Sequence, residues 1–158
     1  MSIESVRAFF AENAPDISVI ESDKSSATVA LAAEAFGVTP AEIAKTLSLR
    51  VGERVLLVVT CGTARLDNKK ARVAFGGKPR MLTAEEALEV TGHPVGGICP
   101  FGLKTPLPVY CDISLKAFDE VVPAAGSINS AVRLSPDRMA ALTRAEWVDV
   151  SEMASASS

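Results

Sequence analysis

A run of glycine and proline residues in the second half of the chain constrains the fold more than any other sequence feature. Of the seventeen residues from 92 to 108, eight are Gly or Pro. These residues disfavour helix and strand interiors, so the run predicts a long loop with demanding backbone angles. Its centre, Gly96-Gly97-Ile98-Cys99-Pro100, could present amide N–H groups to a carbonyl or oxyanion, or form an ordinary tight turn. It lacks the GxxxxGK[ST] spacing of a phosphate loop.

The segments on either side of this loop show helical and strand periodicities in alternation. Helices are expected at 2–12, 27–36, 40–44, 66–75, 84–90 and 136–142, and strands at 17–20, 46–51, 55–60, 109–113, 121–124, 131–134 and 147–150. Thr39-Pro40-Ala41-Glu42 and Thr83-Ala84-Glu85-Glu86 have capping-box patterns, and Ser25 or Ser26 could cap the second helix. A length of 158 residues suits one domain.

The predicted fold class is therefore α+β, with short helices around a mixed, mostly antiparallel sheet or partial barrel. We place this single domain at residues 1–150. The small and polar residues 151–158 are expected to form a flexible tail.

Charge is unevenly distributed along the chain. The formal net charge is −3, from 16 Lys and Arg against 19 Asp and Glu. Residues 65–80 hold six basic residues and one acidic residue, Asp67, so this segment carries +5 and the remainder −8. Such asymmetry favours an anionic partner, although a solvated helix face would also explain it. The six basic residues are Arg65, Lys69, Lys70, Arg72, Lys78 and Arg80.

His93 is the only histidine, which excludes chemistry that needs two imidazoles. The cysteines, Cys61, Cys99 and Cys111, lack CxxC spacing, so free thiols are expected rather than a zinc site or disulfides. Cys99 could be a nucleophile near His93, or a buried thiol. His93 itself could line a pocket or make a structural hydrogen bond.

The first ten residues contain two charges and no apolar core of a signal peptide, and no apolar run reaches the length of a membrane span. We therefore expect a cytoplasmic protein without a membrane partner.

Two further segments hold candidate binding residues. Lys45 lies in the apolar stretch Ile43-Ala44-Lys45-Thr46-Leu47, where a predicted short helix gives way to a strand. Its ammonium could hold a phosphate or carbonyl in a cleft, or remain at the surface above a packed stem. Gly126-Ser127-Ile128-Asn129-Ser130 offers hydroxyls and an amide on a turn, a common composition for turns in general.

Taken together, these segments resemble the YbaK/EbsC-like free-standing editing domains related to the insertion domain of bacterial prolyl-tRNA synthetases. The resemblance extends from Ser25 to Val150. It rests on segments that occur in the family's order: Ala27 to Phe36 followed by Ile43-Ala44-Lys45-Thr46-Leu47, Leu66-Asp67-Asn68-Lys69-Lys70, Thr91 to Gly102, and Ala125-Gly126-Ser127.

The resemblance implies hydrolysis of the ester bond in a mischarged aminoacyl-tRNA, most often tRNA-Pro carrying Ala or another small amino acid. It implies that Lys45 holds the terminal adenosine end, and that Gly96 to Pro100 is a GxxxP element whose backbone positions the substrate carbonyl and the attacking water. No metal or other cofactor is implied. The residues assigned in this way are Lys45, Gly96, Gly97 and Pro100 for catalysis, Thr46, His93, Ile98, Cys99, Gly126 and Ser127 for substrate binding, and the six basic residues of 65–80 for tRNA binding.

An aminoacyl ester is already activated, so orientation and backbone dipoles can supply useful acceleration. Two alternatives stay open: a non-catalytic module that binds tRNA or a synthetase, and a hydrolase that depends on Cys99. The Gly92-His93-Pro94 and Ile98-Cys99-Pro100 segments resemble members that act on alanine or slightly larger residues more than cysteine-specific members. The oligomeric state, the tRNA and a partnership with prolyl-tRNA synthetase are left open.

Overall fold

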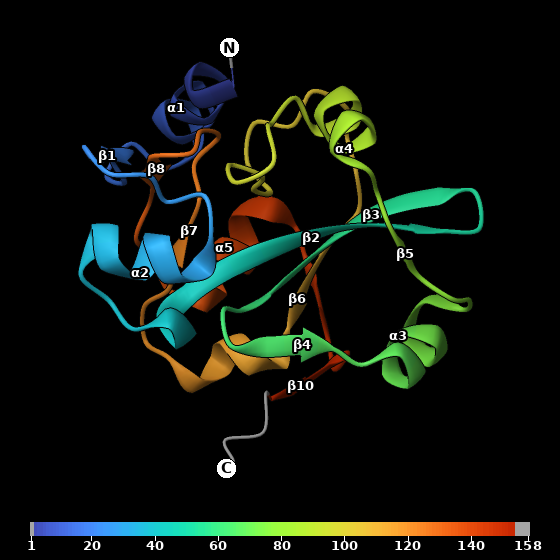
Figure 1. The fold of residues 1–158 in the computed structure, drawn as a ribbon. Helices are drawn as coiled ribbons and strands as arrows, with labels where there is room; N and C mark the ends of the chain where they lie inside the picture. Colours follow the sequence, from blue (N-terminus) through green and yellow to red (C-terminus); the bar gives the residue numbers. More distant parts are fainter. Residues whose placement is uncertain (1, 154–158) are drawn as a thin grey trace.

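A long antiparallel hairpin forms the centre of the molecule (Figure 1). In the computed structural model, which describes residues 2–153, β2 (Ile43–Val51) and β3 (Arg54–Cys61) pair along their whole length. Gly52 in the connecting turn has a φ of 63°, a left-handed conformation that glycine adopts without steric cost. The two strands predicted at 46–51 and 55–60 are confirmed, and β2 begins at Ile43, earlier than expected.

The hairpin belongs to a mixed sheet with the strand order β5-β2-β3-β6-β9, in which β7 also pairs with β2. β5 runs antiparallel to β2, whereas β7, β6 and β9 pair in parallel with their neighbours. The outer strands are β5 (Arg80–Met81), β6 (Val109–Asp112), β7 (Val122–Pro123) and β9 (Glu146–Val148). This arrangement confirms the predicted single α+β domain with a mixed sheet.

Two small antiparallel ribbons complete the strand pairing. β1 (Ile20–Glu21) pairs with β8 (Ser130–Ala131), and β4 (Ala64–Leu66) pairs with β10 (Ser151–Met153). Four of the predicted strands are shorter than expected, since β1, β7, β8 and β9 each keep only two or three residues.

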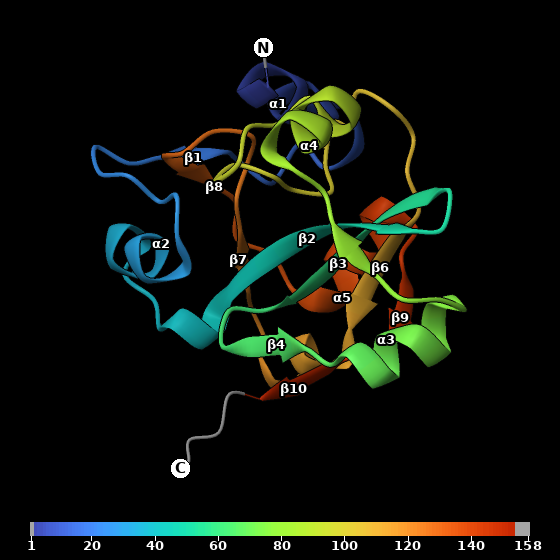
Figure 2. The same ribbon diagram turned by 45° about the vertical axis from the view of Figure 1, so that its right-hand side comes forward.

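Short helices surround the sheet (Figures 1 and 2), and α2 and α3 lie near opposite ends of the hairpin. The α-helices are α1 (Ser2–Asn13), α2 (Val29–Phe36), α3 (Asn68–Phe75), α4 (Ala84–Thr91) and α5 (Pro136–Thr143), and the 3-10 turns are η1 (Pro40–Glu42) and η2 (Ile113–Ala117). Residues 92–108 contain neither helix nor strand, as the glycine and proline content predicts.

Local capping residues fix most helix boundaries. The Asp67 side chain accepts from the N–H groups of Lys69 and Lys70. Thr83 and Glu86 form the expected capping box, in which the side chain of each accepts from the backbone N–H of the other. α2 is capped by Thr28 rather than by Ser25 or Ser26. The short helix expected to reach residue 44 is instead one 3-10 turn, so Lys45 is the third residue of β2.

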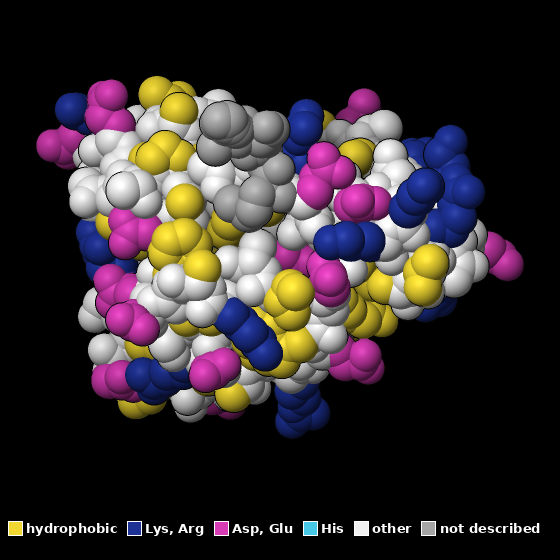
Figure 3. Space-filling model, turned by 90° about the horizontal axis from the view of Figure 1, so that it is seen from below, with side chains coloured by type: hydrophobic (Ala, Val, Ile, Leu, Met, Phe, Trp, Pro, Cys, Tyr) yellow, Lys and Arg dark blue, Asp and Glu magenta, His cyan; other side chains and the backbone are white. Residues whose placement is uncertain are grey.

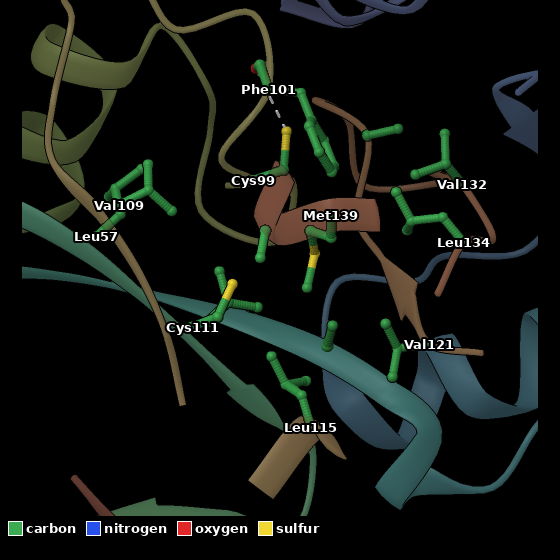
Figure 4. Packing of buried hydrophobic residues seen from close by; sticks show 14 of the residues in the cluster. Leu57, Cys99, Phe101, Val109, Cys111, Leu115, Val121, Val132, Leu134 and Met139 are labelled. Carbon is green, nitrogen blue, oxygen red and sulfur yellow. Dashed lines mark hydrogen bonds between the residues drawn. The ribbon is translucent and has the colours of Figure 1, made fainter. Parts of the chain in front are cut away.

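The main hydrophobic core lies between the sheet, α1 and α5. Leu57 and Cys111 of the sheet pack with Met139 of α5 in one buried cluster (Figure 4). Phe10 of α1 belongs to the same cluster. On the opposite face of the sheet, α3 packs Phe75 against residues of β2 and β3. A third cluster joins α2 to the start of β2 and to β7.

The C-terminal boundary predicted at residue 150 is wrong by at least three residues. Ser151–Met153 forms β10, and the fully buried Asp112 anchors it. The Asp112 carboxylate accepts from Val150 N–H at 2.8 Å and from the Ser151 hydroxyl at 2.5 Å. A distant aspartate therefore orders residues that look like a tail in the sequence. Residues 154–158 lie outside the described residues.

Candidate active site

A cavity of about 210 Å³ opens beside β2, next to α2 and the glycine-proline loop. It lies where β2 lacks a neighbouring strand on one side. β7 pairs only with Ile43 and Ala44, and β5 pairs only with Leu49 and Arg50. Between them, the middle of β2 has no partner strand on that side within residues 2–153, and the cavity occupies this gap.

The cavity is lined by one charged residue, several hydroxyl groups and a largely apolar wall. The charged and hydroxyl-bearing residues are Ser26, Thr28, Lys45, Thr46, Ser48 and Ser130. The apolar wall includes Ala32, Phe36, Ile43, Val95, Val122 and Ala131. Four of the site residues predicted from the sequence line this cavity: Lys45, Thr46, Gly96 and Ile98.

Lys45 is half-buried at the cavity, and its ammonium donates to the carbonyl of Ala64 at 2.5 Å. No carboxylate of the described residues forms an ion pair with it. Burial lowers the pKa of Lys45, and the nearby Cys61 opposes this effect in part. The protein thus keeps a cation at a water-poor surface with only a neutral partner, an arrangement suited to binding an anionic or strongly polar ligand.

Close packing explains the two adjacent glycines of the loop. Gly96 has a φ of +93°, and a Cβ atom added there would lie 3.0 Å from the Cβ atom of Ala27. A Cβ atom on Gly97 would lie 2.6 Å from the backbone nitrogen of Ser127. The loop therefore fits between the segment before α2 and the turn at residues 126–127, and any larger side chain would displace it.

Two N–H groups of this loop, on residues that line the cavity, have no acceptor within residues 2–153. Gly97 N–H donates to the carbonyl of Pro94 at 2.9 Å, and Gly97 C=O accepts from Gly126 N–H at 3.0 Å. The N–H groups of Gly96 and Ile98, which line the cavity, have no acceptor among residues 2–153. Such N–H groups can donate to a ligand oxygen that enters the cavity.

His93 and Cys99 were predicted to bind substrate, and the structure corrects both assignments. Both side chains have zero exposure. His93 contacts the hydroxyl of Ser2 at 2.6 Å and the carbonyl of Phe101 at 2.7 Å, so it ties the loop to α1. In Figure 4 the Cys99 thiol lies inside the main core and points to Phe101. Burial raises the pKa of Cys99 to about 12, which excludes a thiolate at neutral pH.

Four further predicted residues hold the loop in place rather than lining the cavity. Gly97 of the loop packs against Gly126 and Ser127, and none of these three lines the cavity. The Ser127 hydroxyl instead bonds to the hydroxyl of Ser130 at 2.6 Å. Pro100 is buried at the end of the loop and also lies outside the lining.

Sequence reasoning missed three hydroxyl residues of the cavity, Ser26, Thr28 and Ser48, whereas Ser130 belongs to the turn at 126–130 that the sequence offered as a candidate. Thr28 had a detectable signal because it caps α2. The others come from strands and loops that only the tertiary structure brings together.

Comparisons with known proteins identify the family of this chain. The sequence profile of the aminoacyl-tRNA editing domain matches residues 23–142. The chain belongs to this editing-domain family.

Relatives of this editing domain include proteins of similar length. The protein YwhH of Bacillus subtilis is 49% identical over 152 residues, which cover 95% of this chain and 97% of YwhH. The "Putative Cys-tRNA(Pro)/Cys-tRNA(Cys) deacylase EbsC" of Enterococcus faecalis is 29% identical and covers 75% of this chain and 73% of its own. A crystal structure of "a putative trans-editing enzyme for prolyl tRNA synthetase" has a TM-score of 0.89 at 34% identity, with 96% of this chain and 97% of that chain covered.

The basic segment of the editing domain is less positive in the structure than its sequence indicates. Arg65 pairs with Glu152 at 3.6 Å, Lys70 with Asp149 at 3.0 Å, and Arg80 with Glu86 at 3.4 Å. Carboxylates from outside the segment thus pair with three of its six cations. Lys69, Arg72 and Lys78 are exposed and have no ion pair within the described residues. Lys and Arg side chains gather on the right of Figure 3, the side on which α3 lies in Figure 1.

No group of three or more His, Cys, Asp or Glu side chains within residues 2–153 is placed to hold a metal ion. None of the helices in this range combines the length and apolar character needed to cross a membrane.

Proposed function

We propose that this protein is a trans-acting deacylase that hydrolyses the ester bond of a mischarged aminoacyl-tRNA, with tRNA-Pro carrying Ala or another small amino acid as the substrate. The observation that carries this proposal is a single cavity lined by Lys45, Gly96 and Ile98, in which the N–H groups of the two loop residues have no acceptor among the described residues. Membership of the editing-domain family supports the same reaction.

In the proposed reaction, Lys45 holds the terminal adenosine end of the tRNA, and the loop N–H groups bind the oxygen of the ester carbonyl. A water molecule attacks the carbonyl carbon, and the N–H groups stabilise the oxyanion that develops. The bond between the carbonyl carbon and the ribose oxygen then breaks. One proton of the water passes to the departing ribose hydroxyl, and the products are a free amino acid and an uncharged tRNA.

The lining of the cavity supports selection of small aliphatic side chains. The volume of about 210 Å³ holds an aminoacyl group, and most of the wall that would face its side chain is apolar. The nucleoside that carries this group must lie at the mouth of the cavity. Because a synthetase gains only ~1–3 kcal/mol from one methylene group, a second site that admits small residues improves accuracy.

The unpaired cations near α3 support recognition of the tRNA backbone. Lys69, Arg72 and Lys78 are exposed, and this segment leads through β5 to Met81, which lines the cavity. Phosphates bound along this path would direct the acceptor end toward Lys45. Because such contacts release counterions, binding should weaken as the salt concentration rises.

A non-catalytic tRNA-binding module is the second candidate. The observation that favours it is the composition of the cavity, since no Asp, Glu or His of the described residues lines it. A general base for the attacking water would then have to come from the substrate or from a second water molecule.

A deacylation panel separates the two candidates. The purified protein is incubated with tRNA-Pro charged with Ala, Ser, Cys or Pro, and the remaining ester is measured over time. The proposed function requires faster loss of a small aminoacyl group than of the prolyl group. Salt-sensitive tRNA binding without hydrolysis of any of these esters would establish the binding module instead.

A further inference from the structure

The gap in β2 leaves the main chain of Thr46 facing the cavity. The carbonyl of Ser48 accepts from Leu82 N–H at 3.0 Å on the side of β5. Because alternate residues of a strand direct their main-chain groups to the same side, Thr46 directs its N–H and C=O into the gap. Neither β7 nor β5 reaches this residue, since their pairing stops at Ala44 and resumes at Leu49.

The side chain of Thr46 adds an unsatisfied group at the same place. Its hydroxyl oxygen, Oγ1, is buried and has no hydrogen-bond partner among the described residues. Buried polar groups without partners are rare in folded proteins and are costly, since they give up bonds to water. Thr46 lines the cavity, so a ligand in the cavity can supply the missing bond.

The charge of the cavity restricts which substrate group can bind Thr46. Among the described residues, Lys45 is the only charged residue that lines the cavity, so no carboxylate of the cavity wall can pair with an amine. The α-amino group of an aminoacyl ester must therefore find neutral acceptors. The carbonyl oxygen and Oγ1 of Thr46 are two such acceptors on one residue, and either the protonated or the neutral amine can donate to them.

We propose that Thr46 recognises the free α-amino group of the substrate, with its main-chain carbonyl and Oγ1 accepting hydrogen bonds from the amine. This inference rests on the proposed deacylase function. It assigns opposite ends of the aminoacyl group to different elements, the ester carbonyl to the loop at Gly96 and Ile98 and the amine to β2. The site then requires a free amino group and rejects N-acylated esters, in which one donor is lost and a bulky group is gained.

The test compares two isosteric esters on the same tRNA. Alanyl-tRNA carries the amino group, and isobutyryl-tRNA replaces it with a methyl group. Each kcat/KM is divided by the spontaneous hydrolysis rate of that ester, because the amino group itself activates the carbonyl. The wild-type protein should prefer the alanyl ester, and Thr46→Val should reduce that preference by about tenfold, the usual effect of one buried hydrogen bond. Thr46→Ser, which keeps the hydroxyl, should preserve it.

Ser48→Ala is the matched control, because it removes a hydroxyl from the same cavity two residues along β2. It should leave the preference for the alanyl ester unchanged. A purely structural role for Thr46 would lower activity on both esters equally, and this result would overturn the inference. Equal hydrolysis of both esters by the wild-type protein would also overturn it while leaving the deacylase function intact. Failure of the wild-type protein on every ester would refute the proposed function itself.

Discussion

Replacing Lys45 with alanine should remove most of the deacylase activity without unfolding the protein. The ammonium of Lys45 is half-buried beside the cavity and is bonded to a neutral carbonyl, that of Ala64. Because an ammonium has three N–H donors, it can also make a charge-assisted hydrogen bond to the acceptor end of the tRNA when the substrate binds. The variant loses this bond and gains space that water can fill.

The size of the effect follows from the type of contact. A hydrogen bond to a charged group contributes ~1.5–3 kcal/mol. At about 1.4 kcal/mol for each factor of ten, kcat/KM should fall by about ten- to 150-fold. Folding stability should change little, because the lost bond to Ala64 is offset by removing a partly desolvated charge that has no carboxylate partner among the described residues.

The assay measures deacylation of alanyl-tRNA under single-turnover conditions together with thermal unfolding. Lys116→Ala is the control, because the Lys116 ammonium lies 4.5 Å from the ring centroid of Trp147 and does not line the cavity. That variant should lose up to ~1 kcal/mol of stability and keep full activity. A folded Lys45→Ala protein with wild-type kcat/KM would refute the proposed role of this lysine.

The lowered pKa of Lys45 gives an independent readout. Between the folded-state pKa and the ordinary value of 10.5, the unfolded chain binds more protons than the folded chain. The stability of the wild-type protein should therefore rise with pH through this window. Lys45→Met lacks this group, so the stability of the wild type relative to this variant should rise as the pH approaches 10.5.

Three further predictions concern the loop and its supports. Cys99→Ser should retain activity within about twofold, because a buried thiol with a pKa of about 12 supplies no nucleophile; loss of activity in the folded variant would restore the nucleophile hypothesis. Gly97→Ala should lower the unfolding free energy by ~1–3 kcal/mol in chemical denaturation, because its Cβ atom would overlap Ser127; unchanged stability would show that the packing there is loose. Burial lowers the pKa of His93, so wild-type stability should fall as the pH drops below about 6.5 by at most ~1.4 kcal/mol per pH unit. His93→Gln should show a weaker dependence in thermal unfolding at pH 7.5 and 5, and an identical dependence would contradict the assignment.

Much of the local structure was predictable because its determinants are close together in the sequence. The Thr83 capping box, the Asp67 cap and the Gly52 turn all depend on residues within four positions of one another. The lengths of the strands were less predictable. β1 and β7 are only two residues long, because their length depends on partners far away in the chain rather than on their own apolar content.

The candidate site also contains some residues that the sequence predicted correctly and others that it did not. Lys45 and the Gly96 loop stood out by composition, and both line the cavity. His93 and Cys99 belong to the same glycine-proline segment, yet they face the core. Residue spacing in an irregular loop does not reveal which side chains point inward, since no fixed period relates them.

The sequence by itself determined the hairpin, the helix caps, the long loop and the resemblance to editing domains, because these depend on local periodicity and on short segments. Only the tertiary structure decided where the site lies. β5 and β7 stop short of each other along β2, and the resulting gap exposes Thr46 to a cavity that α2 and the loop enclose. Tertiary contacts also bring Glu152 and Asp149 to the basic segment and so reduce its charge. These features arise from contacts between residues far apart in the chain, which no spacing within one segment encodes.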